Sequence, residues 1–316
     1  MVLSRIKLER FTAFESVDIE LFPGINIFTG ANATGKTHVM KVAYAACDVT
    51  KTRLNFAEKL TRVFLPSGWT LGRLVKRSPG SAKCTVEVFR DQTYLHASFS
   101  NRAQKVGSAT VVNFSEWVKD PVETAFIPTK EVLSNAPGFR SLYAQREIHF
   151  EEVHFDILDR AYRPALRGPA DSSCSRVLAE LEKVVGGRVV ASGEEFFLRS
   201  KRGDLEFSLL AEGLRKLGLL WLLVQNGTLR RGSVLFWDEP GASLDPSLFK
   251  VLINTLIELH RVGVQILAAC HDYAVLRELD SQRGSGDSVV FHSLYRDTVT
   301  GEVLHRASER LGVGRE

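Results

Sequence analysis

Long hydrophobic runs are absent from this sequence. Apolar runs such as residues 217–224 and 234–237 are far shorter than the roughly 18 to 20 residues that a helix needs to cross a bilayer. The N-terminal segment MVLSRIK alternates as a strand would and lacks the continuous apolar core of a secretory signal. The sequence therefore predicts a cytoplasmic protein without membrane contact.

Cysteine is scarce, and its spacing indicates no covalent or metal framework. The four cysteines are scattered without a paired C-x-x-C spacing, so neither a set of disulfides nor a zinc site is predicted. We interpret them as reduced and mostly buried thiols: Cys47, Cys84, Cys174 and Cys270.

Neither sign of charge dominates. Lys and Arg number 41 against 37 for Asp and Glu, which leaves a formal charge of +4 on 316 residues. This balance permits contact with nucleic acid but does not demand it. Basic clusters occur within residues 73–77, 199–202 and 230–231, and a solvated face is the more common role of such clusters. DNA or RNA is therefore retained only as a candidate partner.

The composition that remains is that of an ordinary globular chain, with 44% hydrophobic and 25% charged residues. Three regions are expected. An N-terminal lobe covers residues 1–50, an insert of strands and helices in the same head covers 51–203, and a C-terminal lobe covers 204–316.

Apolar spacing predicts the opening elements. Residues 2–8 and 17–21 have the period-2 pattern of antiparallel strands, and 25–29 form a compact apolar strand. Helical spacing from Val39 to Cys47 then predicts a helix that begins near Gly35 and packs one face on a sheet. Further strands are expected at 84–90, 94–99, 110–114 and 124–127, and helices at 150–162 and 175–185.

Helices and strands alternate again after residue 209. A helix, a strand at 234–237, a helix at 246–262 and a strand at 264–269 follow one another, which is typical of a parallel sheet. Asp245 caps the second of these helices and Gly263 ends it. One more strand is expected at 289–295.

The segment between the strand at 25–29 and the next helix, GANATGKT, satisfies the pattern G-x-x-x-x-G-K-[ST]. Its glycines let backbone N–H groups turn toward phosphates, and the helix N-terminus favours an anion. Lys36 is expected to reach the β- and γ-phosphates of ATP, and Thr37 to offer its hydroxyl to Mg²⁺. The predicted nucleotide-binding residues are Gly30, Ala31, Asn32, Ala33, Thr34, Gly35, Lys36 and Thr37.

Two acidic residues follow the wholly apolar strand at 234–237. Because ligands in such sheets bind beyond the carboxyl ends of the strands, Asp238 is expected to hold Mg²⁺ through its water shell. Glu239 is then placed to accept a proton from attacking water. An isolated Asp-Glu pair is more often a loop or a helix cap, but the phosphate-binding loop earlier in the chain favours the catalytic role.

At these residues the chain resembles the ABC ATPase superfamily. Segment 209–216 (LLAEGLRK) is similar to the signature motif, 238–245 (DEPGASLD) to a Walker B motif that continues into a D-loop, and 270–272 (CHD) to the switch histidine. The resemblance implies an α/β P-loop NTPase of ABC-head architecture, in which helices flank a mixed central sheet. An antiparallel β subdomain and a helical insert would complete it.

The same resemblance implies a homodimer that closes around two ATP molecules. The signature helix of one chain would point its N-terminus at the γ-phosphate held by the other. The residues that would reach the partner's nucleotide are Ala211, Glu212, Gly213 and Asp245. Lys36, Glu239 and His271 would be the catalytic residues, with His271 donating a hydrogen bond to the γ-phosphate.

The chain departs from the family pattern in two motifs. Ala211 replaces the usual serine of the signature and Glu212 a glycine, so a hydroxyl contact to the γ-phosphate is lost and weaker dimerisation or slower turnover is expected. No glutamine follows the strand at 124–127, where the Q-loop should begin. Glu131 or Thr129 is the candidate replacement as metal sensor, and an ordinary strand-to-helix turn is the alternative.

Within the superfamily, residues 2–8, 11–14 and 23–26 resemble the heads of RecF-type and SMC-type DNA-maintenance ATPases, although the heptads of a coiled coil are missing. The segments FIPTKEVL, LAEGLRKLG and WDEP resemble compact bacterial and archaeal AAA-domain proteins, which often belong to defence or mobile-element neighbourhoods. Overcoming-lysogeny-type relatives add a nuclease domain, for which the residues after His271 are too few.

The sequence thus predicts an ATPase that serves DNA maintenance or phage defence. One alternative is an ATP-dependent binding switch that grips a partner effector and hydrolyses little, which Ala211 favours. The nucleotide-binding subunit of a transporter is a further alternative, which the altered signature and the long insert disfavour.

Overall fold

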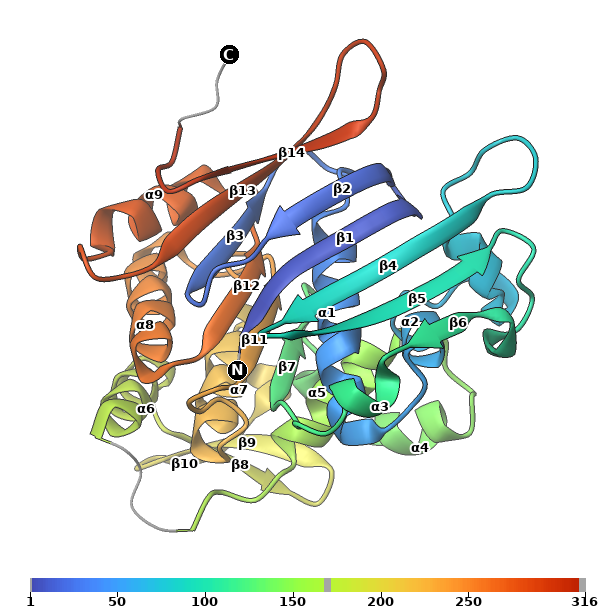
Figure 1. Cartoon of the computed structure of the whole chain (residues 1–316). Coiled ribbons are helices and arrows are strands. Elements are labelled where there is room, and N and C mark those ends of the chain that lie inside the picture. The colour runs from blue at the N-terminus through green and yellow to red at the C-terminus, as the bar shows by residue number, and fades with distance from the viewer. Residues whose placement is uncertain (1, 168–171, 313–316) are drawn as a thin grey trace.

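Two sheets enclose the helix that follows the phosphate-binding loop. The structure is a computed structural model that describes residues 2–167 and 172–312. Helix α1 (Lys36–Thr52) lies between a six-stranded mixed sheet and a five-stranded antiparallel sheet (Figure 1). Helices α7 (Glu212–Gln225) and α8 (Phe249–Val262) pack on the other face of the six-stranded sheet. The chain therefore forms a layered α/β head.

The six-stranded sheet has the order β14-β13-β3-β12-β11-β7, and all neighbouring strands are parallel except β13 and β14. Its strands are β3 (Ile25–Thr29), β7 (Thr124–Ile127), β11 (Val234–Asp238), β12 (Gln265–Ala269), β13 (Val289–Arg296) and β14 (Val303–Ser308). Phe236 packs on the α1 side, whereas Leu235 and Trp237 pack on the α7 and α8 side. Because both faces of the central strands β3, β12 and β11 are covered, these strands are mostly apolar.

The five-stranded sheet covers α1 from the other side. Its order is β2-β1-β4-β5-β6, with antiparallel neighbours. Its strands are β1 (Leu3–Phe11), β2 (Phe14–Glu20), β4 (Lys83–Arg90), β5 (Thr93–Ser100) and β6 (Thr110–Val112). As a result α1 is buried nearly all round, including Met40 and Tyr44, and not only on the one face that its sequence pattern indicated.

A small third sheet of order β10-β9-β8 packs near the start of α7. Its strands are β8 (Arg188–Ser192), β9 (Glu195–Ser200) and β10 (Gly203–Glu206). The remaining helices are α2 (Phe56–Phe64), α3 (Phe114–Trp117), α4 (Phe139–Ala144), α5 (Glu152–Ala161), α6 (Ser172–Val185) and α9 (Tyr273–Gln282). Short 3₁₀ turns are η1 (Ser67–Trp69), η2 (Leu71–Leu74), η3 (Val106–Ser108), η4 (Leu133–Asn135), η5 (Phe207–Leu209) and η6 (Pro246–Leu248).

Most elements lie where the sequence pattern placed them, and one strand is shorter than expected. The strand predicted at 110–114 ends at Val112, because Asn113 adopts a left-handed conformation with φ 63° and Phe114 begins α3. Helices α2 and α9 and the sheet β8–β10 were not predicted. Among the described residues, no helix is both long enough and apolar enough to span a membrane.

A buried ionic cluster joins three helices beneath the five-stranded sheet. Lys59 of α2 is fully buried, and its Nζ lies 2.7 Å from Asp48, 2.7 Å from Asp156 and 3.0 Å from Glu152. Arg160 pairs with Asp48 as well. Burial by itself would lower the pKa of Lys59, but the attraction of Asp156, Asp48 and Glu152 outweighs it and raises that pKa. The charged ammonium therefore ties α2 to α1 and α5.

Candidate nucleotide site

Three adjacent strands of the six-stranded sheet bring the sequence motifs together. Strand β3 leads into residues 30–37, β12 ends just before residues 270–272, and β11 ends at Asp238. These strands are neighbours and parallel, so their carboxyl ends lie at one edge of the sheet (Figure 1). Segments about 200 residues apart in the sequence thus form a single site.

The phosphate-binding loop is closely packed at both of its glycines. A Cβ atom at Gly30 would lie 2.0 Å from the carbonyl oxygen of Leu294, and one at Gly35 would lie 2.5 Å from the ring of Phe14. Both glycines also have positive φ, at 136° and 92°, which favours glycine. Lys36 Nζ donates to the Gly30 carbonyl oxygen at 2.8 Å, so its ammonium lies over the loop.

The middle of the loop is held by side-chain contacts to its backbone. Thr34 Oγ1 donates to the carbonyl oxygen of Ala31 at 2.9 Å, and Arg296 Nη2 donates to that of Ala33 at 2.9 Å. Asn32 is exposed. Arg296 ends β13, far away in the sequence, and no local pattern predicted that it would support this loop.

Thr37 and Asp238 connect the loop to β11. Thr37 Oγ1 lies 3.1 and 3.2 Å from the two carboxylate oxygens of Asp238. Burial raises the pKa of Asp238, while hydrogen bonds from Thr37 and Thr129 act in the opposite direction. A hydroxyl and a carboxylate are the oxygen ligands that Mg²⁺ prefers, directly or through water, so these side chains fit the metal that the family implies.

The structure separates the two candidates for the Q-loop. Thr129 follows β7 and hydrogen-bonds Asp238. Glu131 points elsewhere: its Oε2 lies 2.8 Å from Nε of Arg215, it accepts a hydrogen bond from the backbone N–H of Leu133, and its side chain is only 2% exposed. Glu131 therefore anchors the following turn to α7. Of the two candidates, only Thr129 faces the side of the site that holds Thr37 and Asp238, which we call the metal side.

Glu239 and His271 face each other at the ends of β11 and β12. Glu239 Oε1 lies 2.7 Å from His271 Nδ1, and Oε2 accepts a 3.4 Å hydrogen bond from the His271 backbone N–H. Glu239 has φ 54°, an uncommon conformation for a residue with a side chain and one that is frequent at functional sites. The backbone thus aims this carboxylate at the histidine rather than along the strand.

The signature-like residues begin α7. Ala211 is the N-cap, Glu212 starts the helix, and no side chain in the described part of the chain caps it. The backbone at Gly213 packs tightly on the D-loop, since a Cβ atom there would lie 2.7 Å from the carbonyl oxygen of Ser243. The first-turn N–H groups of α7 are therefore left for other partners.

The D-loop is held from the same helix. Lys216 Nζ donates to the carbonyl oxygen of Ala242 at 2.9 Å, and Asp245 accepts a 2.8 Å hydrogen bond from the Ser247 N–H as the cap of η6. Within the described residues, no hydrogen bond or ion pair joins 211–213 or Asp245 to residues 30–37. The fold thus brings these two motifs to each other and not to their own phosphate-binding loop.

One basic residue beside the metal side was not predicted. Lys41 lies one helical turn beyond Thr37 on α1, is buried, and pairs with Glu151 at 2.5 Å. Its charge opposes the rise in the pKa of Asp238 that burial causes. The i, i+4 spacing from Thr37 places both side chains on one face of the helix, and this spacing is the signal that could have identified Lys41.

A phosphate-binding loop at the end of one parallel strand, with acidic residues at the end of a nearby one, defines a P-loop NTPase. More particularly, the chain belongs to the family described as "AAA domain, putative AbiEii toxin, Type IV TA system", which matches residues 90–277. The matched region includes Asp238, Glu239 and His271 and begins after the phosphate-binding loop.

Curated relatives match part of the chain. The DNA replication and repair protein RecF of Streptococcus suis (strain 05ZYH33) is 24% identical over 149 residues, which cover 47% of this chain and 38% of that protein. RecF of Latilactobacillus sakei subsp. sakei (strain 23K) is 29% identical over 163 residues, 51% of this chain and 39% of that protein. The chain therefore spans well under half of the length of these relatives.

Solved structures match nearly the whole chain. The SmcHead bound to the C-winged helix domain of ScpA aligns with a TM-score of 0.60, 12% identity and 98% coverage of both chains. The Smc head with an extended coiled coil bound to the C-terminal domain of ScpA, derived from Pyrococcus furiosus, aligns with a TM-score of 0.54 and 10% identity. The alignment covers 97% of this chain and 96% of that chain. At such identity the likeness concerns the fold alone, and it confirms the predicted α/β head architecture.

Proposed function

We propose that this protein binds MgATP on residues 30–37 and hydrolyses it at a site that a second copy completes. The observation that supports this proposal is the meeting of Thr37 with Asp238, and of Glu239 with His271, at the ends of adjacent parallel strands. Oxygen ligands for a metal and a carboxylate base thereby lie at the edge of the sheet where the phosphate-binding loop begins.

Each side chain has a distinct role in this proposal. Lys36 and the loop N–H groups hold the phosphates, while Thr37 and Asp238 hold Mg²⁺, whose charge neutralises the phosphate oxygens when it is bound. Glu239 accepts the proton of the attacking water. His271 positions the Glu239 carboxylate through Nδ1–H, and when both ring nitrogens carry a proton, Nε2–H donates to the γ-phosphate.

Surface features support a composite site between two copies. The N-terminus of α7 carries no side-chain cap within the described residues, and such a helix end favours an anion. Leu209 beside it is 69% exposed, and Tyr273 after the switch-like segment is 60% exposed. Exposed apolar side chains next to both motifs are what a closing interface would cover.

The dimer proposal predicts a mass change. Because Glu239→Gln should retain ATP, we expect this variant to shift from monomer to dimer in MgATP and to remain monomeric without nucleotide, as measured by light scattering. Adding Leu209→Glu should raise the dissociation constant of the dimer at least about tenfold, since it places a charge in the interface. Val299→Glu, at a 91% exposed apolar residue on the β13–β14 turn, is the matched control.

A parallel measurement is steady-state phosphate release over a range of protein concentrations. A composite site requires activity that rises faster than linearly with concentration. A monomer in every nucleotide state together with strictly linear activity would refute the composite site.

The Q-loop geometry gives a prediction on metal dependence. Thr129→Val removes a hydroxyl that faces Asp238, and a hydrogen bond of this kind contributes about 1 kcal/mol, so the Mg²⁺ concentration for half-maximal turnover should rise roughly fivefold. Glu131→Gln should leave that concentration unchanged, because Glu131 contacts Arg215. The reverse ranking in a Mg²⁺ titration of ATPase activity would show that the geometric assignment is wrong.

The biological process is proposed from the relatives. RecF similarity favours DNA maintenance, and the toxin–antitoxin family description favours defence against phage. A second candidate function is an ATP-dependent switch that grips a partner effector with little turnover, which the missing hydroxyl at Ala211 supports. Tight ATP-dependent capture of a partner without phosphate release would select the switch.

A further inference from the structure

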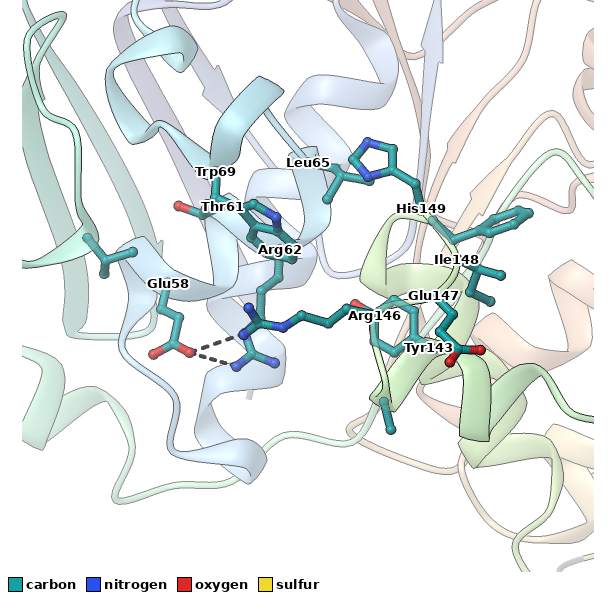
Figure 2. Close-up of a pocket in the computed structure, with 13 residues that line it drawn as sticks. Glu58, Thr61, Arg62, Leu65, Trp69, Tyr143, Arg146, Glu147, Ile148 and His149 are labelled. Carbon is teal, nitrogen blue, oxygen red and sulfur yellow. Dashed lines mark hydrogen bonds and ion pairs between the residues drawn. The ribbon is translucent and has the colours of Figure 1, made fainter.

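A cavity of about 580 Å³ lies in the insert, away from the strand ends. Figure 2 shows its two sides. Arg62 from α2 and Trp69 from η1 form one side, and Arg146 and His149 from the loop between α4 and α5 form the other. The Arg146 side chain extends across the cavity toward the α2 side. We call this space the outer cavity.

A second cavity of about 470 Å³, which we call the inner cavity, adjoins the first. Leu65, His149 and Phe150 line both. Thr37 and Asp238 line only the inner cavity, so it opens on the metal side of the nucleotide site. The two cavities therefore meet at these three residues, with the inner cavity beside the proposed metal ligands and the outer cavity beside Trp69.

The backbone of the outer cavity is strained at the residues that shape it. Leu65, Trp69 and Arg146 have positive φ, at 48°, 56° and 60°. Bulky side chains rarely adopt this conformation, and residues held in it cluster at binding sites. Glu239 shows the same feature in the nucleotide site, at φ 54°.

The outer cavity presents an aromatic face next to a cation. Trp69 is 43% exposed, and the Arg146 guanidinium lies 5.8 Å from the centre of the Trp69 ring. Arg62 is paired with Glu58 and Glu152. Arg146, in contrast, has no carboxylate within ion-pair distance among the described residues. An exposed ring and an unpaired guanidinium are suited to a planar ligand that carries negative charge.

The inner cavity presents basic groups where such a ligand would continue. Lys130 is exposed and likewise has no ion-pair partner in the described chain. His149 lines the junction of the two cavities, and buried Lys41 lies deeper, paired with Glu151. The space thus changes from aromatic at one end to basic at the other.

We propose that the joined cavities bind a second nucleotide, separate from the ATP on the loop. Its base stacks on Trp69 beside Arg146, and its phosphate lies near His149 and Lys130. Stacking on aromatic rings combined with cations that follow phosphates is how proteins bind nucleotides without regard to sequence. The volume of the outer cavity suits a ligand of this size. The ligand is a free nucleoside monophosphate or the 5′-phosphorylated end of a single strand.

Trp69 provides a specific signal for a test. The other tryptophans, Trp117, Trp221 and Trp237, are buried, so quenching of the intrinsic fluorescence by an added base would report on Trp69. The probes are thymidine 5′-monophosphate and 5′-phosphorylated hexathymidylate, each titrated into the full chain without any other nucleotide. We expect saturable quenching that persists in Lys36→Ala, because the second site does not use the loop. Failure of the proposed ATPase function would therefore leave this result unchanged.

The replacement residues are chosen to tolerate the positive φ angles at Trp69 and Arg146. Asparagine tolerates a left-handed conformation, so Trp69→Asn and Arg146→Asn remove the ring and the cation. Binding of hexathymidylate labelled with fluorescein at its 3′ end, followed by anisotropy, should weaken about 10- to 100-fold in Trp69→Asn and stay within about twofold in Trp69→Phe. Arg146→Asn should weaken it as well, and Arg230→Ala, in a distant basic cluster, should not.

The outcomes separate the two sources of the ligand. Saturation by the monophosphate supports a free nucleotide, and saturation by the hexanucleotide alone supports a strand end. The proposal is overturned by absence of quenching with both probes, by equal affinity in Trp69→Asn and the wild type, or by loss of binding in Lys36→Ala. Equal quenching by a glutamate hexapeptide would overturn it in favour of an acidic protein partner.

Discussion

ATP turnover is expected to fall roughly 10²- to 10⁴-fold when Glu239 is replaced by glutamine, while ATP still binds. Glutamine keeps the size of the side chain and can still contact His271, whose Nδ1 lies 2.7 Å from Glu239 Oε1. It cannot accept a proton from water at neutral pH. The rate should therefore fall because of lost proton transfer rather than a changed site. Steady-state phosphate release from MgATP measures the effect.

Two controls make this result specific. Glu20→Gln alters an exposed carboxylate on β2 and should release phosphate at the wild-type rate. Binding of a fluorescent ATP analogue should be retained in Glu239→Gln, which shows that the loop is intact. Equal phosphate release by Glu239→Gln and the wild type would rule out Glu239 as the general base.

The free energy of unfolding is expected to fall by about 3–5 kcal/mol when Lys59 is replaced by methionine. Methionine fills much the same space but leaves Asp48, Asp156 and Glu152 without the cation that contacts all three. Removing one partner of a buried ionic group is costly, because the remaining charges stay in a medium that solvates them poorly. Urea denaturation at pH 7 measures the loss.

The pH dependence of Lys59→Met distinguishes this cause from a packing defect. Burial and mutual repulsion should raise the carboxylate pKa values in the folded variant, so that the folded state binds more protons than the unfolded state. The free energy of unfolding of the variant should then increase as the pH falls from 7 to 5, and its deficit relative to the wild type should shrink. A deficit independent of pH would indicate lost packing instead.

An exposed pair provides the control for the buried cluster. Lys51 is 39% exposed and pairs with Glu123 at 2.7 Å. Lys51→Met should cost less than about 1 kcal/mol, because water already screens the charges of an exposed pair. A similar loss in the free energy of unfolding for Lys51→Met and Lys59→Met would mean that burial does not set the strength of the Lys59 cluster.

Local patterns were sufficient for the elements that carry the site. The strand at 25–29 matches β3 in full, because its compact apolar run needs both faces covered. The predicted start of α1 near Gly35 agrees with Gly35 as its N-cap, and Gly263 ends α8 with φ 100°. These features depend on residues that are neighbours in sequence, so propensity and spacing could predict them.

Contacts between distant segments could not be predicted in this way. The sequence left Thr129 and Glu131 both open as candidates, beside an ordinary turn, and only the path of the chain after β7 turned Glu131 toward Arg215. The same holds for Arg296, which reaches the phosphate-binding loop from the end of β13. No periodicity encodes which charged side chain will meet which backbone carbonyl.

The sequence by itself determined the order of motifs, the parallel strands that present them and the chemistry that the loop at 30–37 can support. Only the tertiary structure decided that Glu239 meets His271, that Lys59 is buried among carboxylates, and that Trp69 lines a cavity in the insert, away from the strand ends. The physical reason is the distance along the chain over which each interaction acts. Backbone conformation responds to residues within a few positions, whereas burial and charge pairing depend on segments brought together by packing.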